Sequence, residues 1–215
     1  MQLTTGLASA NNREVIAKRK QQTQAEQFNS VNDACVSVRG SKIHGWGLYA
    51  DQEFAEEDVV AEYVGEYINN ETAEAREKLY REHRIQDYMF RVNDDLVIDA
   101  TMKGGNGRYA NHSCGPNCYA KNIPADGKKG LRRVMIIALK PINVNEEITY
   151  DYQFPLETDL DNRLPCHCRA ETCRGFMNWD LPERGNVTPM LVQKRGANMR
   201  DRIRRLGRPL KRDEN

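Results

Sequence analysis

The 215-residue chain carries 32 Lys and Arg against 31 Asp and Glu, a formal net charge of +1. This length suits one domain with tails, and the balanced total charge excludes no class of partner. No apolar run approaches the length of a membrane span, and residues 1–20 contain no signal-peptide core, which predicts a soluble intracellular protein. Six cysteines without a secretory signal favour a metal site over a disulfide framework.

The first half of the chain combines strands with one helix. Residues 1–34 are polar, and the stretch 13–28 fits either a weakly ordered lead-in or a partner-binding helix. Alternation predicts a strand over 35–39, and the glycines that follow indicate either a hairpin turn or backbone that approaches a ligand. β-Branched and aromatic residues over 59–68 predict one or two strands. Composition then predicts a helix over about 69–86, capped by Asn69 or Asn70.

The second half of the chain reads mostly as strands. A hairpin is predicted over 88–98, and further strands over 118–123, 133–139 and 148–152, with a turn at Asp126-Gly127. Many short strands, one clear helix and long connections predict a mostly β member of the α+β class. Beyond residue 178 the chain becomes basic: residues 184–212 hold ten Lys or Arg against one acid, Asp201.

The most polar stretch runs from Arg108 to Cys118 and contains Asn111, His112, Ser113 and Cys114 before Gly115-Pro116. Glycine and proline end regular structure, so a loop is predicted here. By itself the stretch fits a hydrogen-bonded turn as well as a functional loop. Three further cysteines, Cys166, Cys168 and Cys173, lie within eight residues of one another, and that spacing alone leaves a zinc site and a coincidence open.

Together with Thr149-Tyr150-Asp151-Tyr152, these motifs resemble the signature of the SET-domain lysine methyltransferases over about residues 36–178. The resemblance implies a SET fold of several small sheets with a knot-like C-terminal segment. It divides the chain into a lead-in (1–34), a SET domain (35–155) with an insert helix, a post-SET zinc segment (156–178) and a basic tail (179–215).

The resemblance also implies residue roles. The cofactor would be S-adenosylmethionine, and Tyr152 would lie closest to the methyl group in transfer. Tyr150 would restrict the number of methyl groups, so mainly monomethyl product is expected, and Tyr63 would line the lysine channel. Ordinary core packing is the alternative for these aromatics, as it is for Phe90. Residues implied to bind or border the donor are Lys42, His44, Trp46, Tyr49, Tyr88, Arg108, Asn111, His112, Tyr150, His167, Phe176 and Met177.

A single structural zinc would be bound by Cys166, Cys168, Cys173 and, by resemblance alone, Cys114. The stretch from Tyr150 to Glu157 and the motif His44-Gly45-Trp46-Gly47-Leu48-Tyr49 are similar to the trithorax and mixed-lineage-leukaemia branch, the catalytic subunits of COMPASS complexes. That branch implies a nuclear histone H3 lysine-4 methyltransferase with COMPASS-type partner subunits. Ala110 and Gly115 depart from its usual pattern.

Two alternatives to this function stay open. One is methylation of another histone or non-histone lysine, and the other is an inactive SET module that binds a tail or scaffolds a complex. The basic tail fits either a solvated end or contact with nucleosomal DNA.

Overall fold

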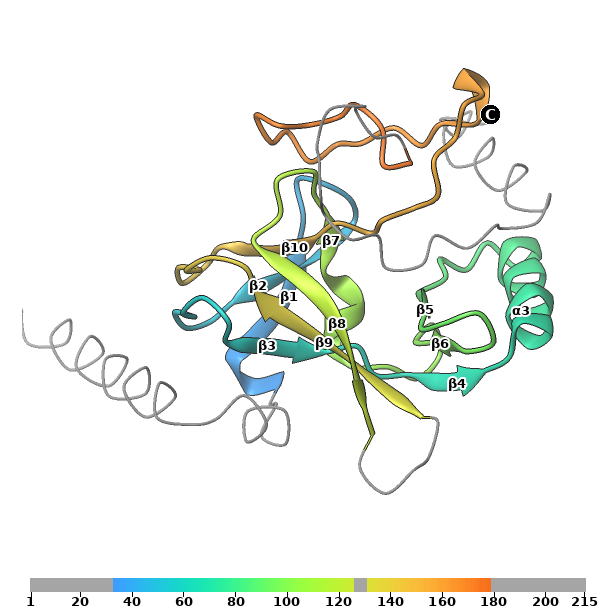
Figure 1. Cartoon of the computed structure of the whole chain (residues 1–215), viewed down its shortest axis with the longest axis horizontal. Helices are drawn as coiled ribbons and strands as arrows, with labels where there is room; N and C mark the ends of the chain where they lie inside the picture. The colour runs from blue at the N-terminus through green and yellow to red at the C-terminus, as the bar shows by residue number, and fades with distance from the viewer. Residues whose placement is uncertain (1–32, 126–130, 179–215) are drawn as a thin grey trace, which may run out of the picture. The chain divides into compact units, whose positions relative to one another are not determined.

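The computed structural model describes residues 33–125 and 131–178 (Figure 1). Three sequence predictions lie outside these residues: the helix within 13–28, the turn at Asp126-Gly127 and the basic tail. Among the described residues, no helix is both long and apolar enough to cross a membrane.

The larger sheet has seven strands, and its order is β1-β2-β10-β8-β9-β3 with β7 paired to β10. Most neighbours are antiparallel, while β10 and β8 run parallel and pair Tyr150 with Cys118. The strands are β1 (Val36–Gly40), β2 (Trp46–Ala50), β3 (Val59–Glu62), β7 (Asn111–His112), β8 (Cys118–Pro124), β9 (Arg132–Ala138) and β10 (Glu147–Tyr150).

A second, antiparallel sheet has the order β4-β6-β5. Its strands are β4 (Glu66–Ile68), β5 (Met89–Arg91) and β6 (Val97–Asp99). Helix α3 (Asn70–Glu82) lies beside this sheet (Figure 1), and its Ala73 packs with Ile68 and Val97. Three short 3-10 helices complete the described elements: η1 (Asp33–Cys35), η2 (Asn106–Tyr109) and η3 (Leu160–Asn162). The mostly β fold class is therefore confirmed.

The core lies on β9 and its neighbours because their apolar residues are buried together. Val134, Met135, Ile136 and Ile137 on β9 are at most 1% exposed. Burial of that many aliphatic side chains provides a large hydrophobic stabilisation, on the order of 2 kcal/mol for each. The predicted strand over 133–139 and the predicted helix after residue 69 both form. Asn69 caps that helix, because its side chain accepts a hydrogen bond from the Thr72 N–H.

The polar stretch from Arg108 to Cys118 differs from its prediction as a loop. Asn111 and His112 form strand β7, which pairs with β10. Asn and His have little β propensity, so the local sequence gives no sign of this strand. The partner strand β10 satisfies the hydrogen-bonding groups of the β7 backbone. It lies some 36 residues later in the chain, which is the separation between Asn111 and its contact Glu147.

A buried carboxylate joins helix α3 to the small sheet. Asp99 is 1% exposed and accepts hydrogen bonds from the Arg76 guanidinium and the Tyr80 hydroxyl, at 2.8 and 2.9 Å. Burial acts to raise the pKa of Asp99, but hydrogen bonds from Arg76 and Thr101 outweigh it and lower the pKa below its ordinary value. Asp99 is therefore ionised and paired at neutral pH.

Asp99→Asn should lower the free energy of unfolding by about 3 kcal/mol, since it leaves buried donors without their charged acceptor. Urea denaturation at pH 7 measures this loss. Because the pKa of Asp99 is lowered on folding, the difference between the two proteins should shrink as the pH falls through that pKa. The matched control is Glu66→Gln, which removes the exposed partner of the same Arg76. A loss in the control as large as that in Asp99→Asn would contradict the prediction.

The chain forms two compact units. Among the described residues, one unit contains 33–111 together with 116–125 and 131–150, and it includes both sheets apart from His112 of β7. The other contains the described residues 112–115 and 151–178. We describe the site within each unit separately.

Candidate functional site

In the first unit, the buried side chain of Asn111 is fixed by three acceptors. Its Nδ2 lies 3.2 Å from the carbonyl oxygen of His44, 2.9 Å from that of Trp46 and 2.9 Å from Glu147 Oε1. A carboxamide donates only through its nitrogen, so these three acceptors set its orientation. Asn111 therefore holds the chain between β1 and β2 through the backbone of that segment.

That segment is a hairpin connection, which confirms the turn interpretation of its glycines. The Ser41 N–H donates to the Gly45 carbonyl oxygen, and Gly45 has a φ of 47°. Positive φ favours glycine there. The predicted residues Lys42, His44 and Trp46 are exposed on this hairpin, Trp46 by 59%.

Three predicted aromatic residues lie close together in the first unit. The rings of Tyr63 and Phe90 are 5.3 Å apart between centroids, and those of Phe90 and Tyr150 are 6.4 Å apart. Tyr63 and Tyr150 are 5% and 7% exposed. The cluster continues into the apolar core around Ile98, so core packing and a channel wall are compatible descriptions of these rings.

Tyr88 and Arg108 form a neighbouring group. The Tyr88 ring meets the Tyr109 ring edge-on at 5.4 Å, and the Arg108 guanidinium lies over both rings. Arg108 also donates to the Ala100 carbonyl oxygen at 2.8 Å. Its side chain thus fixes the 3-10 helix η2, which ends two residues before Asn111, to the residue that follows β6.

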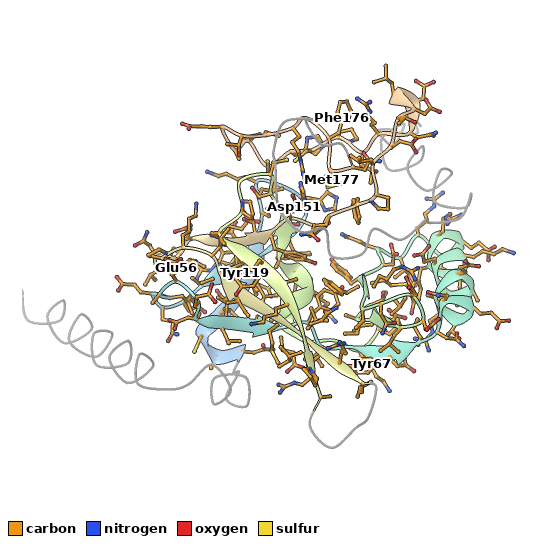
Figure 2. All side chains as sticks on the ribbon, viewed as in Figure 1. Glu56, Tyr67, Tyr119, Asp151, Phe176 and Met177 are labelled. Atoms are coloured by element: carbon orange, nitrogen blue, oxygen red, sulfur yellow. The ribbon has the colours of Figure 1, made fainter. Side chains whose placement is uncertain are left out.

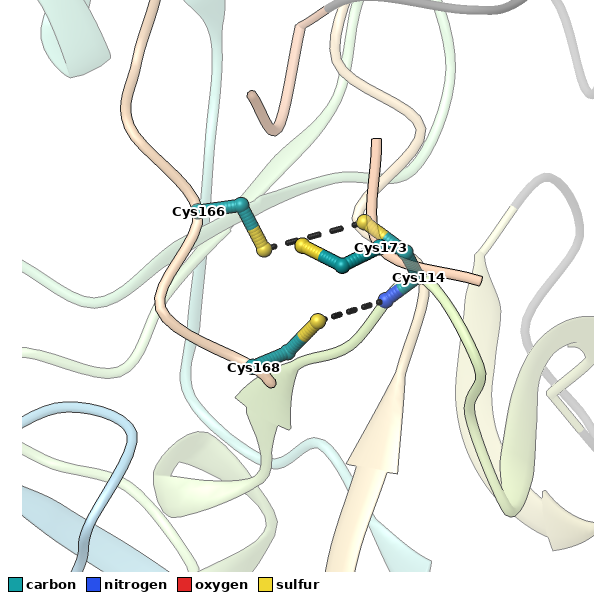
Figure 3. Close-up of side chains that lie close together, drawn as sticks. All are labelled: Cys114, Cys166, Cys168 and Cys173. Carbon is teal, nitrogen blue, oxygen red and sulfur yellow. Dashed lines mark hydrogen bonds between the residues drawn. The ribbon is translucent and has the colours of Figure 1, made fainter. Parts of the chain in front are cut away.

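The second unit brings four cysteines to one point (Figure 3). The sulfur atoms of Cys114, Cys166, Cys168 and Cys173 all lie within 4.8 Å of one another, and those of Cys114 and Cys166 are 3.6 Å apart. Four thiolates at such distances can hold one metal ion. The structure therefore groups the three cysteines of the spacing motif with Cys114, which only the resemblance had added.

Backbone N–H groups donate hydrogen bonds to two of these sulfur atoms. Cys114 N–H donates to Cys168 Sγ, and Gly175 N–H to Cys173 Sγ. Burial acts to raise the pKa of Cys168, but hydrogen bonds from the backbone of Cys114 and Ala170 outweigh it and lower the pKa to about 6. The backbone thus favours the thiolate form that a metal requires.

His112 connects this cluster with Tyr152 inside the second unit. Its Nδ1 accepts a hydrogen bond from the Tyr152 N–H at 3.2 Å, and its Nε2 lies 3.5 Å from Cys114 Sγ. Burial lowers the pKa of His112 to about 4, with Asp151 opposing and Arg174 reinforcing the change. The neutral ring therefore carries its proton on Nε2 and donates it toward the Cys114 sulfur.

The Tyr152 ring lies between two others, with the His112 and Phe154 rings 5.3 and 5.4 Å away. Asp151 binds Arg174, whose NH2 lies 3.0 and 2.9 Å from its two carboxylate oxygens. The predicted residues Phe176 and Met177 are half-buried in the last described segment (Figure 2), and His167 is exposed beside the cysteines.

Sequence reasoning missed two residues of this arrangement, Glu147 and Arg174. Glu147 contacts Asn111 across 36 residues, and Arg174 contacts Asp151 across 23. No local pattern marks either residue. Their only signal is position, since each directly adjoins a predicted motif: the strand that begins at Ile148 and the cysteine Cys173.

Comparison with known proteins places these motifs in one family. The family model described as "SET domain" matches residues 45–153. This range contains the hairpin tip from Gly45, the aromatic cluster, Asn111, His112 and Tyr152, and it ends before the three clustered cysteines after residue 165.

Three curated relatives carry the name "Histone-lysine N-methyltransferase, H3 lysine-4 specific". The protein of Aspergillus oryzae is 42% identical over 188 residues, which cover 81% of this chain. Those of Kluyveromyces lactis and Saccharomyces cerevisiae are 49% and 50% identical over 66% and 64% of it. The matches span only 13–15% of the length of these relatives.

Proposed function

Because the chain belongs to the SET-domain family, we propose that it is a histone-lysine methyltransferase that uses S-adenosylmethionine, with lysine 4 of histone H3 as its substrate. The finding that carries this proposal is the identity of 42–50% to relatives named for that activity. S-Adenosylmethionine supplies the methyl group: its S–CH3 bond breaks as the bond from the neutral lysine Nζ to carbon forms. The chain must therefore align two substrates and favour an uncharged amine.

The first unit supports this role through Asn111 and the aromatic cluster. Asn111, His44 and Trp46, joined by hydrogen bonds, would bind the donor together with Lys42, Tyr88 and Arg108. The buried faces of Tyr63, Phe90 and Tyr150 would line the lysine channel, where low polarity disfavours the charged amine and lowers its pKa. The Tyr150 hydroxyl would restrict room at the amine, which favours monomethyl product.

The second unit would supply Tyr152 as the residue closest to the methyl group, while His112, His167 and Met177 would contribute to donor binding. We also propose that the four cysteines hold one structural zinc. Four thiolates around tetrahedral zinc lie about 3.8 Å apart, and the observed limit of 4.8 Å and the separation of 3.6 Å between the Cys114 and Cys166 sulfur atoms fit a single ion. All four ligand positions would be filled by protein, so the ion's chemistry there is structural.

The proposal extends to partners and location. A histone methyltransferase acts in the nucleus on nucleosomes, and COMPASS-type subunits are the partners that the branch resemblance suggests. The ten basic residues of the tail would add contact with nucleosomal DNA by charge attraction.

Incubation with S-adenosylmethionine and recombinant histone H3 tests the proposed function. Mass spectrometry should find methyl groups at lysine 4, mainly one per lysine, and none on H3 in which this lysine is replaced by alanine. Methylation that persists on the variant H3 would refute lysine 4 as the target, while the proposed methyl-transfer reaction would stand. Binding of S-adenosylmethionine without turnover on H3, nucleosomes or other histones would favour the inactive module.

A further inference from the structure

Glu147, the first residue of β10, accepts hydrogen bonds from three side chains of the first unit. Its Oε1 lies 2.6 Å from Ser41 Oγ and 2.9 Å from Asn111 Nδ2, and its Oε2 lies 3.1 Å from the Tyr49 hydroxyl. A carboxylate can accept from all three at once because it has about four acceptor positions and no donor. Glu147 of β10 thus joins β2, β7 and the connection between β1 and β2 around one carboxylate.

The hydroxyl of Ser41 links Glu147 to the hairpin connection between β1 and β2. Ser41 Oγ accepts hydrogen bonds from the backbone N–H groups of Ile43 and His44, at 2.9 and 3.3 Å. Since its own proton is donated to Glu147, its lone pairs face those N–H groups. The carboxylate therefore acts on residues 41–46 through Ser41 and, by the amide of Asn111, through the carbonyl groups of His44 and Trp46.

Gly47 leaves space for the Glu147 carboxylate because it has no side chain. A Cβ added to Gly47 would lie 2.5 Å from Glu147 Oε1 and 2.9 Å from Glu147 Cδ, so any side chain there would displace the group. Gly47 has no positive φ to explain it. The requirement for glycine at this position is space for Glu147, not backbone conformation.

We infer that Glu147 is a positioning residue for the methyl donor: it fixes the Asn111 amide and the 41–46 connection in the conformation that binds S-adenosylmethionine. The inference rests on the proposed function, since it assigns the donor to these residues. The contact with Glu147 keeps Nδ2 of Asn111 directed toward the hairpin. The carbonyl oxygen Oδ1 of the same amide then faces the opposite side. Without a negative acceptor the amide can rotate, and the connection loses both of its constraints.

The test compares Glu147→Gln with Glu146→Gln in the 215-residue chain. Glu146 is a matched control because it is adjacent and also accepts hydrogen bonds, from Asn117 and Asn143, without touching Asn111. Glu147→Gln should raise the Kd and the KM for S-adenosylmethionine about tenfold, as expected for lost hydrogen bonds to a charged group. The kcat at saturating donor and the KM for an H3 peptide should stay within about twofold. Glu146→Gln should leave the donor Kd within about twofold.

A double-mutant cycle shows whether Glu147 acts through Asn111. In an Asn111→Ala background, Glu147→Gln should raise the donor Kd by no more than about threefold. The milder Ser41→Ala removes one contact to the same carboxylate and should raise the Kd about threefold, so it replaces Glu147→Gln if that variant fails to fold.

Unchanged donor affinity in both Glu147→Gln and Ser41→Ala would overturn the inference, as would an undiminished effect in the Asn111→Ala background. If the wild-type chain bound no S-adenosylmethionine, the proposed function itself would be refuted and the inference with it. The wild-type measurement therefore separates the two failures.

Discussion

Tyr152→Phe should lower the kcat for H3 methylation by about a hundredfold, with little change in the Kd for S-adenosylmethionine. Removal of one well-placed hydrogen-bonding group from a reaction centre typically costs this much. The variant should fold, because Phe retains the ring that contacts His112 and Phe154 and the backbone N–H that donates to His112 Nδ1. Single-turnover assays with an H3 peptide measure the loss.

The control for this variant is Tyr119→Phe, which makes the same chemical change on β8. Figure 2 labels the Tyr119 side chain. Its hydroxyl donates to Glu57 Oε2 at 2.9 Å, and burial together with Glu57 raises the pKa of Tyr119 to about 12. This contact has no part in the proposed chemistry, so the kcat should stay within about twofold. A Tyr152→Phe protein with more than a third of wild-type kcat would rule out the role assigned to its hydroxyl.

Cys173→Ser should abolish zinc binding and most methyl transfer together. Elemental analysis should fall from about one zinc per chain to less than about 0.2, because structural sites need all four ligands. Activity should follow, since the Cys114 sulfur lies 3.5 Å from His112 Nε2 and the opposite ring nitrogen accepts the Tyr152 N–H bond. Loss of the cluster thus removes a fixed neighbour of the histidine that holds Tyr152.

Cys35→Ser provides the matched control, because Cys35 is half-buried and lies outside the cluster. It should retain both zinc and activity. Treatment of the wild-type protein with a chelator should reproduce the Cys173→Ser defect, and added zinc should reverse it. Full activity in zinc-free protein would refute the coupling between the cluster and Tyr152.

The parts of the fold that sequence predicts well are those set by local pattern. The apolar run on β9 and the capped helix α3 are fixed by burial of their own side chains and by neighbouring residues such as Asn69. Strand β7 was predicted as loop because its pairing with β10 comes from distant residues. Local propensity carries no information on such pairing.

In the candidate site, too, local sequence patterns could be predicted and contacts between distant residues could not. The spacing of Cys166, Cys168 and Cys173 marked these three residues as a candidate metal site and left coincidence open, whereas Cys114 required the resemblance because 52 residues separate it from Cys166. Glu147 could not be predicted as a partner of Asn111, since a glutamate at the start of a strand is ordinary in sequence. Its contacts exist only once β2, β7, β10 and the connection between β1 and β2 are assembled.

The separation of Cys114 from the other three cysteines also has a consequence for synthesis on the ribosome. The second unit is built from His112–Gly115 and residues after Tyr150, so no continuous fragment contains it alone. At about 5–20 residues per second, the first thiol leaves the ribosome several seconds before the last. A nascent chain can complete the four-sulfur cluster only after Tyr63, Phe90 and Tyr150, the residues of the proposed lysine channel, have been made. Metal bound at the four-cysteine cluster would therefore distinguish chains translated through Cys173 from those that stop earlier.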